Sequence, residues 1–168
     1  MNLVRHSRVS MPALRDLLTE LGYEDVRTYL QSGNVVLTSP KAPARLAKEL
    51  EQAIADELGV TPRVVVRTRT ELAAVVRRDP FGSVATDPKR YQVTFLSAKP
   101  RAAVVRELSS ADFAPERVEI SGREIYAWHP NGLQRSKLAR ALTDERLGVV
   151  ATARNWNTVT KLLELADE

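Results

Sequence analysis

The residues best suited to bind a ligand lie in two short polar segments, of which the more unusual is near the C-terminus. The run from Arg154 to Val159 contains an arginine, a tryptophan and two asparagines. Arg154 comes just before a predicted helix, whose first turn offers free backbone N–H groups and the positive end of the helix dipole. With Asn155 and Asn157, these groups could hold a phosphate or a carboxylate. The structural alternative is that Asn155 caps the helix, Trp156 anchors the contact between subdomains and Asn157 bonds neighbouring backbone.

The second polar segment is a predicted hairpin turn from Gln31 to Asn34. Its amides and its hydroxyl could recognise the hydrogen-bonding edge of a ligand, with Gln31 and Asn34 as the expected contacts. The same residues also suit a turn without a ligand, because Gly and Asn accept positive φ and Ser and Asn bond their own backbone. The two segments form one site only if the fold assembles them around a common cleft.

His129 is the best candidate for acid–base chemistry. It follows Trp128 and precedes Arg135 and Lys137 by a few residues. General acid–base catalysis also needs a partner within hydrogen-bonding reach, and the sequence identifies none. We therefore expect a surface histidine beside an ordinary Pro-Asn-Gly turn, and we leave enzymatic activity open.

Metal and cofactor sites are not expected. The chain has 2 His and 0 Cys, and its carboxylates do not cluster at ligand spacing. Neither a Walker loop nor a dinucleotide-binding glycine motif occurs, and no serine lies in a nucleophile elbow.

The composition indicates a soluble globular protein without a membrane span. Of its 168 residues, 43% are hydrophobic and 27% charged, and no apolar run approaches the roughly 20 residues that cross a bilayer. The N-terminus has no apolar stretch that suits a signal peptide, and the lack of cysteine fits a reducing compartment, so we expect a cytoplasmic protein.

The net charge of +4 makes phosphate-bearing partners worth considering. Basic residues are interleaved with Asp and Glu, which is typical of a solvated surface rather than a nucleic-acid footprint. An RNA-stacking surface would need Tyr91 and Phe95 exposed on one strand beside Tyr126 and Trp128 on its neighbour. Since aromatic residues make up only 5% of the chain, we expect most of them in the core.

The elements that position these residues follow from hydrophobic periodicity and turn signals. In residues 1–85 the patterns predict helices at 11–21, 44–58 and 70–78, and strands at 26–30, 35–38 and 64–66. In residues 86–168 they predict strands at 91–96, 117–120, 124–128 and 149–151, and helices at 101–108, 134–142 and 155–165. The order predicts an α+β fold of two packed ferredoxin-like (split βαβ) subdomains, 1–85 and 86–168.

The first subdomain lacks one element of that fold. A strand should precede the first helix, but the nine residues before Ser10 do not alternate convincingly. We expect either that the recorded start is too late or that something else covers the unpaired position in the sheet.

The chain resembles the bacterial domain-of-unknown-function family 1697 over essentially its whole length. Four segments carry the resemblance: Asn2 with 9–11, then 29–36, 126–137 and 154–163. Members of that family begin with an additional strand ending in Arg-Gly-Ile-Asn before paired glycines. Here only Asn2 remains of it, and Val4 and Arg5 align with the glycines. The resemblance implies an α+β fold with two subdomains and implies no activity.

The functional expectation is a cytoplasmic protein that binds a small anionic or phosphorylated ligand between its subdomains. The expected contacts are Gln31, Asn34, Arg154, Asn155 and Asn157, with no cofactor and no metal. The alternatives are a nucleic-acid binding module, or an interaction module in which a partner covers the unpaired strand position. The sequence carries no signal for the oligomeric state.

Overall fold

The computed structural model describes residues 9–168 of the chain. Its internal contacts divide the chain into two compact units. The first unit runs up to Glu71 and includes Leu162–Glu168, and the second unit is Leu72–Lys161. Both are α+β, as the sequence predicts.

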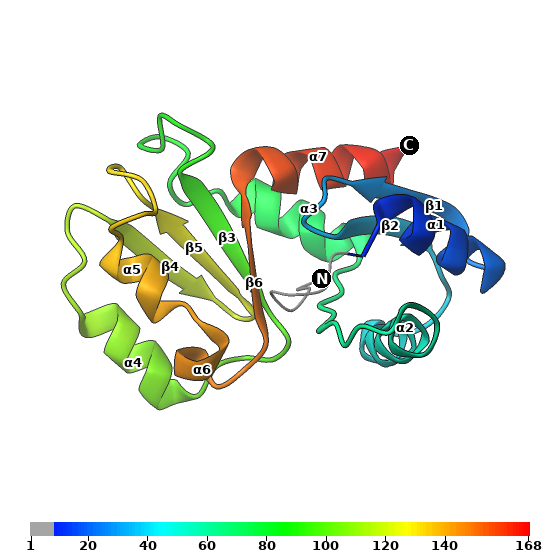
Figure 1. Ribbon diagram of the computed structural model, residues 1–168. Helices are drawn as coiled ribbons and strands as arrows, with labels where there is room; N and C mark the ends of the chain where they lie inside the picture. Colours follow the sequence, from blue (N-terminus) through cyan, green and yellow to red (C-terminus); the bar gives the residue numbers. More distant parts are fainter. Residues whose placement is uncertain (1–8) are drawn as a thin grey trace. The chain divides into compact units, whose positions relative to one another are not determined.

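The first unit is built from two helices and a hairpin (Figure 1). In sequence order these are helix α1 (Met11–Glu20), strands β1 (Glu24–Tyr29) and β2 (Asn34–Thr38), and helix α2 (Pro43–Leu58). The two strands pair antiparallel. The side chain of Ser10 caps α1 by accepting a hydrogen bond from the backbone N–H of Ala13 at 3.3 Å. These elements confirm the predicted ones to within two residues at each end.

The core of this unit is formed by the apolar faces of the two helices. Leu14 and Leu18 of α1 and Ile54 of α2 are at most 1% exposed, and side chains of the hairpin pack against them. The spacing of three and four residues places these side chains on one face of each helix. Burying each such side chain stabilises the fold by about 1.5–3 kcal/mol.

The predicted strand at 64–66 is wrong. These residues are extended and only half buried, and apart from a single bridge at Arg63 the described residues give them no strand neighbour. Val64 and Val66 do pack against the core, but the backbone N–H of Val64 donates to Glu51 Oε1 at 2.7 Å. The Glu51 side chain thus accepts the hydrogen bond that a neighbouring strand would accept in a sheet. The expected lack of a strand at the chain start concerns residues 1–8, which lie outside the described residues.

Side-chain contacts explain why the end of the chain belongs to the first unit. Arg27 Nη1 in β1 donates to the carbonyl of Leu165 at 3.1 Å and to Glu168 Oε2 at 2.6 Å. Arg69 Nε donates to Asp167 Oδ1 at 2.5 Å. The division therefore falls at 71/72 and 161/162, inside helices α3 (Arg69–Arg78) and α7 (Trp156–Asp167), whereas the sequence places it in a loop near residue 85.

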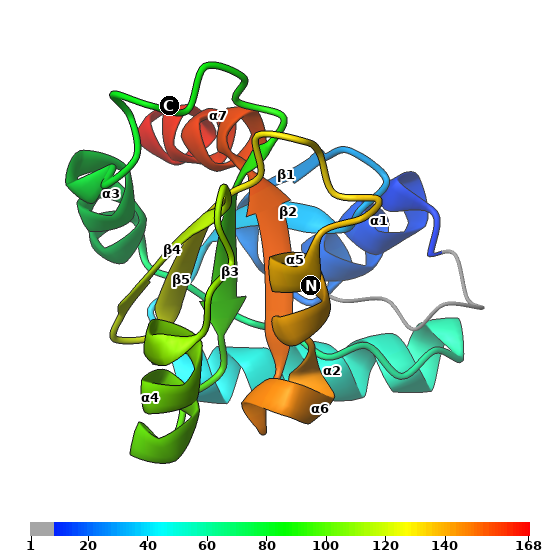
Figure 2. The ribbon, with the colours of Figure 1, turned by 90° about the vertical axis from the view of Figure 1, so that its left-hand side faces the viewer.

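The second unit contains a four-stranded antiparallel sheet (Figure 2). Its strands are β3 (Tyr91–Leu96), β4 (Arg117–Ser121), β5 (Glu124–Trp128) and β6 (Ala151–Asn155), in the spatial order β4-β5-β3-β6. Helix α4 (Ala102–Ser110) connects β3 to β4, and α5 (Lys137–Ala141) and α6 (Asp144–Leu147) connect β5 to β6. This connectivity and order are those of the ferredoxin-like fold.

Figures 1 and 2 show α4, α5 and α6 on the same face of this sheet. Leu108 of α4 and Leu147 of α6 form a buried cluster there with Leu96, Ile125 and Ala151 of the strands. Alternate residues of a strand point to the same face, so Leu96, Ile125 and Ala151 face these helices, whereas Val93 and Tyr126 face the opposite side of the sheet.

Two boundaries in the second unit differ from the predicted ones. The helix predicted at 134–142 is two short helices, because Ser136 caps α5 and Thr143 caps α6 with their side-chain oxygens. The last strand is 151–155 rather than 149–151, because its register with β3 pairs Ala151 with Leu96 and Asn155 with Gln92. Among the described helices, none combines the length and the apolar character that crossing a membrane requires.

Leu18 and Leu21 make a matched pair for testing the core of the first unit. Leu18 is 1% exposed and Leu21 is 49% exposed. We expect Leu18→Ala to lower the free energy of unfolding by about 2–5 kcal/mol, because it removes buried apolar surface and leaves a cavity. Leu21→Ala should change it by less than about 0.5 kcal/mol. Urea denaturation followed by circular dichroism measures both, and equal losses for the two variants would contradict this core assignment.

Candidate functional site

Arg154 lies on β6, opposite Val93 of the central strand β3. Its Nη1 donates to Thr152 Oγ1 at 2.6 Å and to the carbonyl of Ala153 at 2.8 Å. Burial lowers the pKa of the guanidinium from its ordinary value of 12.5, although an arginine stays charged at neutral pH. A cation that has lost much of its hydration is a favourable partner for an anion.

The start of α7 has the geometry of a capped helix. Asn155 Oδ1 accepts from the backbone N–H of Thr158 at 3.0 Å, which is the hydrogen bond that the capping interpretation expects. The backbone N–H of Trp156 donates to the carbonyl of Pro88 at 3.1 Å, and its ring stacks on Tyr91 with centroids 4.6 Å apart. Trp156 is therefore an anchor within the second unit. Asn157, one residue into the helix, is exposed.

Arg154 and Asn155 are neighbours in sequence but lie on opposite faces of the sheet. Successive residues of a strand alternate between faces, and both belong to β6. A ligand held by the Arg154 guanidinium therefore does not have the side chain of Asn155 beside it on the same face. Two predicted contacts belong to the helix rather than the strand, so the alternation does not apply to them: the exposed side chain of Asn157 and the backbone N–H groups in the first turn of α7.

The hairpin turn of the first unit is held by its own polar groups. Asn34 is 5% exposed, and its Nδ2 donates to the carbonyl of Tyr29 at 2.8 Å and to Ser32 Oγ at 2.9 Å. Gly33 has φ of +85°, which glycine adopts without strain. Gln31 is exposed. These are the bonds that the turn interpretation expects, and of the two predicted contacts Gln31 is the exposed one.

The two predicted binding segments belong to different units. Gln31 and Asn34 are in the first, and Arg154, Asn155 and Asn157 are in the second. Each segment is locally ordered by its own hydrogen bonds. The common cleft that the sequence suggests stays a prediction.

His129 is not the surface residue that the sequence suggests. It is 1% exposed, and its Nδ1 donates to Glu116 Oε2 at 2.5 Å. Ser136 Oγ also donates to Glu116 Oε2 at 2.5 Å and lies 3.0 Å from His129 Nδ1. The backbone N–H of Leu138 completes the cluster by donating to Glu116 Oε1 at 3.3 Å. The partly buried carboxylate of Glu116 thus connects the end of β5 to the start of α5.

These contacts set the charge state of Glu116. Burial alone raises the pKa of its carboxyl, but the hydrogen bonds from Ser136, His129 and Leu138 outweigh burial and hold the pKa below its ordinary value of 4.5. The carboxylate is therefore ionised at neutral pH. The sequence gives little sign of this role, because Glu116 lies 13 residues before His129 in a loop.

The cluster of Glu116, His129 and Ser136 does not have the geometry of a nucleophilic triad. In such a triad the serine and the carboxylate contact different nitrogens of the histidine ring. Here both lie against Nδ1, and Ser136 Oγ also accepts from the backbone N–H of Ala139 at 2.8 Å as the cap of α5. The cluster therefore satisfies buried polar groups and fixes α5.

The aromatic residues of the sheet are buried, as expected. β3 and β5 are neighbours, with Tyr91 opposite Trp128 and Val93 opposite Tyr126. Tyr91, Phe95, Tyr126 and Trp128 are each at most 7% exposed. Burial raises the pKa of the Tyr126 hydroxyl to about 12, and that hydroxyl donates to the carbonyl of Val75 in α3 at 3.0 Å. These rings are not available to stack on nucleotide bases.

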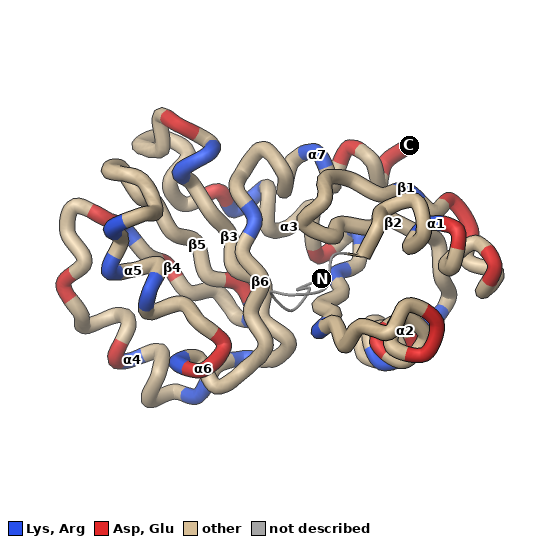
Figure 3. The backbone as a smooth tube through the Cα atoms, viewed as in Figure 1, with Lys and Arg blue, Asp and Glu red and all other residues tan. Residues whose placement is uncertain are grey.

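The charged residues of both units are mixed in sign (Figure 3). Helix α2 carries both basic and acidic residues, namely Arg45, Lys48, Glu49, Glu51, Asp56 and Glu57, and residues 135–147 also carry both signs. This mixture is typical of a solvated surface.

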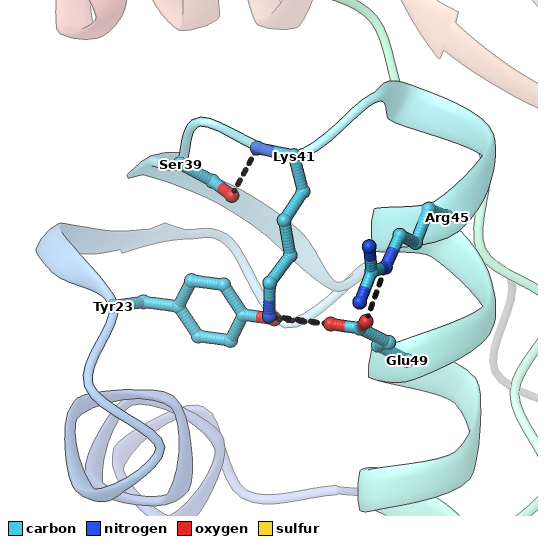
Figure 4. Close-up of polar contacts among 5 residues, drawn as sticks. All are labelled: Tyr23, Ser39, Lys41, Arg45 and Glu49. Atoms are coloured by element: carbon cyan, nitrogen blue, oxygen red, sulfur yellow. Dashed lines mark hydrogen bonds and ion pairs between the residues drawn. The ribbon is translucent and has the colours of Figure 1, made fainter.

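One charged cluster in the first unit joins α2 to the residue that precedes β1 (Figure 4). Lys41 Nζ donates to Glu49 Oε2 and, at 3.2 Å, to the hydroxyl of Tyr23, and Arg45 Nε donates to Glu49 Oε1 at 2.9 Å. The bond to Glu49 raises the pKa of the Lys41 ammonium, and the same bond lowers the pKa of Glu49. Both groups are charged at neutral pH, so Lys41 is not a nucleophile there.

The pH dependence of stability tests the role of Glu116. The folded chain holds the proton of this carboxyl less tightly than the unfolded chain does, so its contribution is present above pH 4.5 and is lost as the pH falls through the lower folded pKa. We expect Glu116→Gln to destabilise the protein by about 1–3 kcal/mol at pH 7, and the difference from wild type to shrink below pH 4.5. Urea midpoints from pH 7 to pH 3 measure it.

Glu107→Gln is the control for this series, because Glu107 is exposed on α4. Its midpoint should follow wild type across the range. A Glu116→Gln protein that is as stable as wild type at pH 7 would show that the Glu116 carboxylate does not hold α5 in place.

Comparisons with known proteins agree with this architecture. A family model described as "Protein of unknown function (DUF1697)" matches residues 1–126. A solved structure, described as conserved bacterial protein SP0830 from Streptococcus pneumoniae, is similar with a TM-score of 0.73 and 22% identity, over 98% of this chain and 93% of that chain. At this identity the likeness shows the fold alone. A comparison with curated proteins finds no match. Since the family model covers well over half of its length, the chain belongs to the DUF1697 family.

Proposed function

We propose that the protein binds a small anionic or phosphorylated ligand at the junction of β6 and α7, with Arg154 as its main contact. The observation that carries this proposal is the largely buried guanidinium of Arg154, whose pKa is lowered by burial. A partly dehydrated arginine gains more from an anion than an exposed one does, because the surrounding dielectric is lower. The planar guanidinium also matches the geometry of phosphate and carboxylate oxygens.

The first turn of α7 supports the same ligand chemistry. The helix has 12 residues and carries no acidic residue in its first turn, so no side chain of that turn supplies the negative charge that a helix N-terminus favours. Asn157 is exposed there and could add an amide contact. Asn155 contributes by capping the helix. For Gln31 and Asn34, ligand contact stays a separate prediction.

A cytoplasmic location is part of the same proposal. It is supported by the absence of cysteine from the chain, which fits a reducing compartment. Small phosphorylated metabolites are the class of ligand that we would test first, with inorganic phosphate as the simplest probe.

The test is a thermal-shift screen of inorganic phosphate and a panel of sugar phosphates and nucleotides. A ligand present at 100 times its Kd stabilises the folded protein by about 2.7 kcal/mol, which raises the melting temperature by several degrees. We expect at least one compound to do so with wild type. Arg154→Gln should lose the shift and Arg154→Lys should retain part of it, because lysine keeps the charge without the fork of donors.

Arg106→Gln is the matched control, because Arg106 is exposed on α4 in the same unit. Its shifts should equal those of wild type. Equal shifts for wild type and Arg154→Gln, or no shift with any compound, would rule out Arg154 as the anion contact. Isothermal titration with the best compound gives the affinity of each variant directly.

A further inference from the structure

The loop that joins α3 to β3 lies against the start of α7. Residues 79–90 form this loop, and the carbonyl of Pro88 accepts a hydrogen bond from the backbone N–H of Trp156 at 3.1 Å. Figures 1 and 2 both show the loop beside the first turn of α7, and both segments belong to the second unit. The loop therefore occupies part of the helix end at which we propose that an anion binds.

The contact with Pro88 competes with an anion for a donor. In the first turn of α7, the N–H of Trp156 donates to this carbonyl, and the N–H of Thr158 donates to Asn155 Oδ1 at 3.0 Å. An anion at a helix start binds N–H groups that are free of other partners. A carbonyl oxygen carries partial negative charge and repels an anion at short range. An anion thus gains the Trp156 donor only after the loop moves away.

The loop begins at a residue with a strained backbone. Asp79 has φ of +31°, which lies in the left-handed region. Residues with a Cβ rarely adopt this region, because the Cβ crowds the neighbouring backbone. Such strain persists only where the surrounding structure holds it, and it is common in segments that switch between conformations. Opening of the loop would allow Asp79 to relax.

The side chain of Asp79 is packed without all of its hydrogen bonds. Within residues 9–168, Asp79 Oδ1 is buried and has no hydrogen-bond partner. The carboxylate lies so close to Gly82 that a Cβ built there would be 2.2 Å from Asp79 Oδ2. Burial, together with a hydrogen bond to the same carboxylate, raises the pKa of the Tyr91 hydroxyl. A buried carboxylate oxygen without a donor costs free energy that contact with water recovers.

Contacts of Phe81 and Arg90 hold the loop in its closed position. Phe81 is half buried, its ring lies 6.1 Å from that of Tyr91, and its N–H donates to the Tyr91 hydroxyl at 3.4 Å. The carbonyl of Arg90 accepts from the N–H of His129 at 3.0 Å, and Arg90 Nη1 donates to the carbonyl of Pro130 at 2.7 Å. These last two bonds fix the end of the loop, so movement is confined to the residues before Arg90.

We propose that the loop 79–90 is a lid over the start of α7. When closed, it blocks the first turn with the Pro88 carbonyl, and when open, it frees the Trp156 N–H for an anion. Asp79 sets the balance, because its backbone strain and its unpartnered oxygen are both relieved in the open lid. The ligand of the open lid rests on the function proposed above for Arg154, whereas the opening itself can be measured without a ligand.

Two substitutions should shift this balance in opposite directions. Asp79→Asn keeps the size of the side chain, and an amide costs less to bury without a partner than a carboxylate does, so it should favour the closed lid. Gly82→Ala places a methyl group against the Asp79 carboxylate and should favour the open lid. Gly82 is not among the glycines with positive φ, so alanine suits its backbone.

Native-state hydrogen exchange of the Trp156 amide, followed by NMR, measures the lid in the absence of a ligand. This amide loses its partner when Pro88 moves away, so its exchange rate follows the open population. We expect Asp79→Asn to slow exchange about tenfold and Gly82→Ala to speed it about tenfold, because an unpaired buried polar group carries a cost of that size. The Leu96 amide, which donates to the carbonyl of Arg123 at the far end of β3, is the control and should be unchanged.

An Asp79→Gly background separates this contact from a general disruption of the loop. Without the carboxylate, the methyl group of Gly82→Ala no longer meets the oxygens of Asp79, so the substitution should change exchange by less than about twofold. A tenfold effect that persists in this background would show that Asp79 does not set the balance of the lid.

Inorganic phosphate links the lid to the anion site. If the anion binds only the open lid and the closed lid predominates, the apparent Kd is the intrinsic Kd divided by the open fraction. Phosphate affinity, measured by isothermal titration, should therefore change by the same factor as the exchange rate: about tenfold tighter for Gly82→Ala and about tenfold weaker for Asp79→Asn. Arg106→Gln, at an exposed position on α4, should bind phosphate as wild type does.

The lid and the anion site fail in different ways. Equal exchange of the Trp156 amide in wild type and both variants would overturn the lid. Phosphate affinities that stay equal while exchange changes would also overturn it, and would leave the anion site in place. If exchange changes as expected but no variant binds phosphate or any compound of the panel, the movement of the loop is confirmed and the anion site at Arg154 is overturned.

Discussion

The antiparallel pairing of β3 with both of its neighbours is the constraint on which the second unit depends. Tyr91, Val93 and Phe95 of this strand face one side of the sheet, and Thr94 and Leu96 face the other. The register then fixes the faces of β5 and β6. It buries the four aromatic rings that could otherwise have stacked on nucleotides, places Arg154 beside Val93, and turns Asn155 to the opposite face. It also leaves β4 and β6 as the two edges of the sheet.

The second constraint is that buried polar groups must form hydrogen bonds. This need accounts for most of the polar residues that the sequence offers as candidates for a catalytic or binding site. Glu116 accepts hydrogen bonds from His129, Ser136 and Leu138. For these donors, the carboxylate takes the place of the water molecules that would solvate them in the unfolded chain. Asn155 does the same for the start of α7, and Asn34 for the hairpin turn. In each case the side chain bonds a local backbone or a buried neighbour. Side chains committed in this way have less freedom to bind a ligand.

The anion site that we propose lies on β6, at one edge of the four-stranded sheet. Its main feature is the partly buried guanidinium of Arg154 close to the start of α7. A lower surrounding dielectric strengthens the attraction between a guanidinium and an anion. The other edge of the sheet is β4, whose strand neighbour among the described residues is β5.

The sequence by itself determined most helices and strands, because each has a local hydrophobic periodicity. Helices α1 and α2 and strand β3 lie within two residues of the predicted ranges. The α+β class and the ferredoxin-like order of elements follow from these predictions. The cap at Asn155 and the turn at Asn34 were also within its reach, since both bonds are local. Only the tertiary structure decided that Val64–Val66 pairs with no described strand, that β6 extends to Asn155, and that His129 is buried against Glu116. Those outcomes depend on partners distant in the chain. Hydrophobic periodicity identifies the apolar face of a segment, but it does not identify the segment that packs against that face.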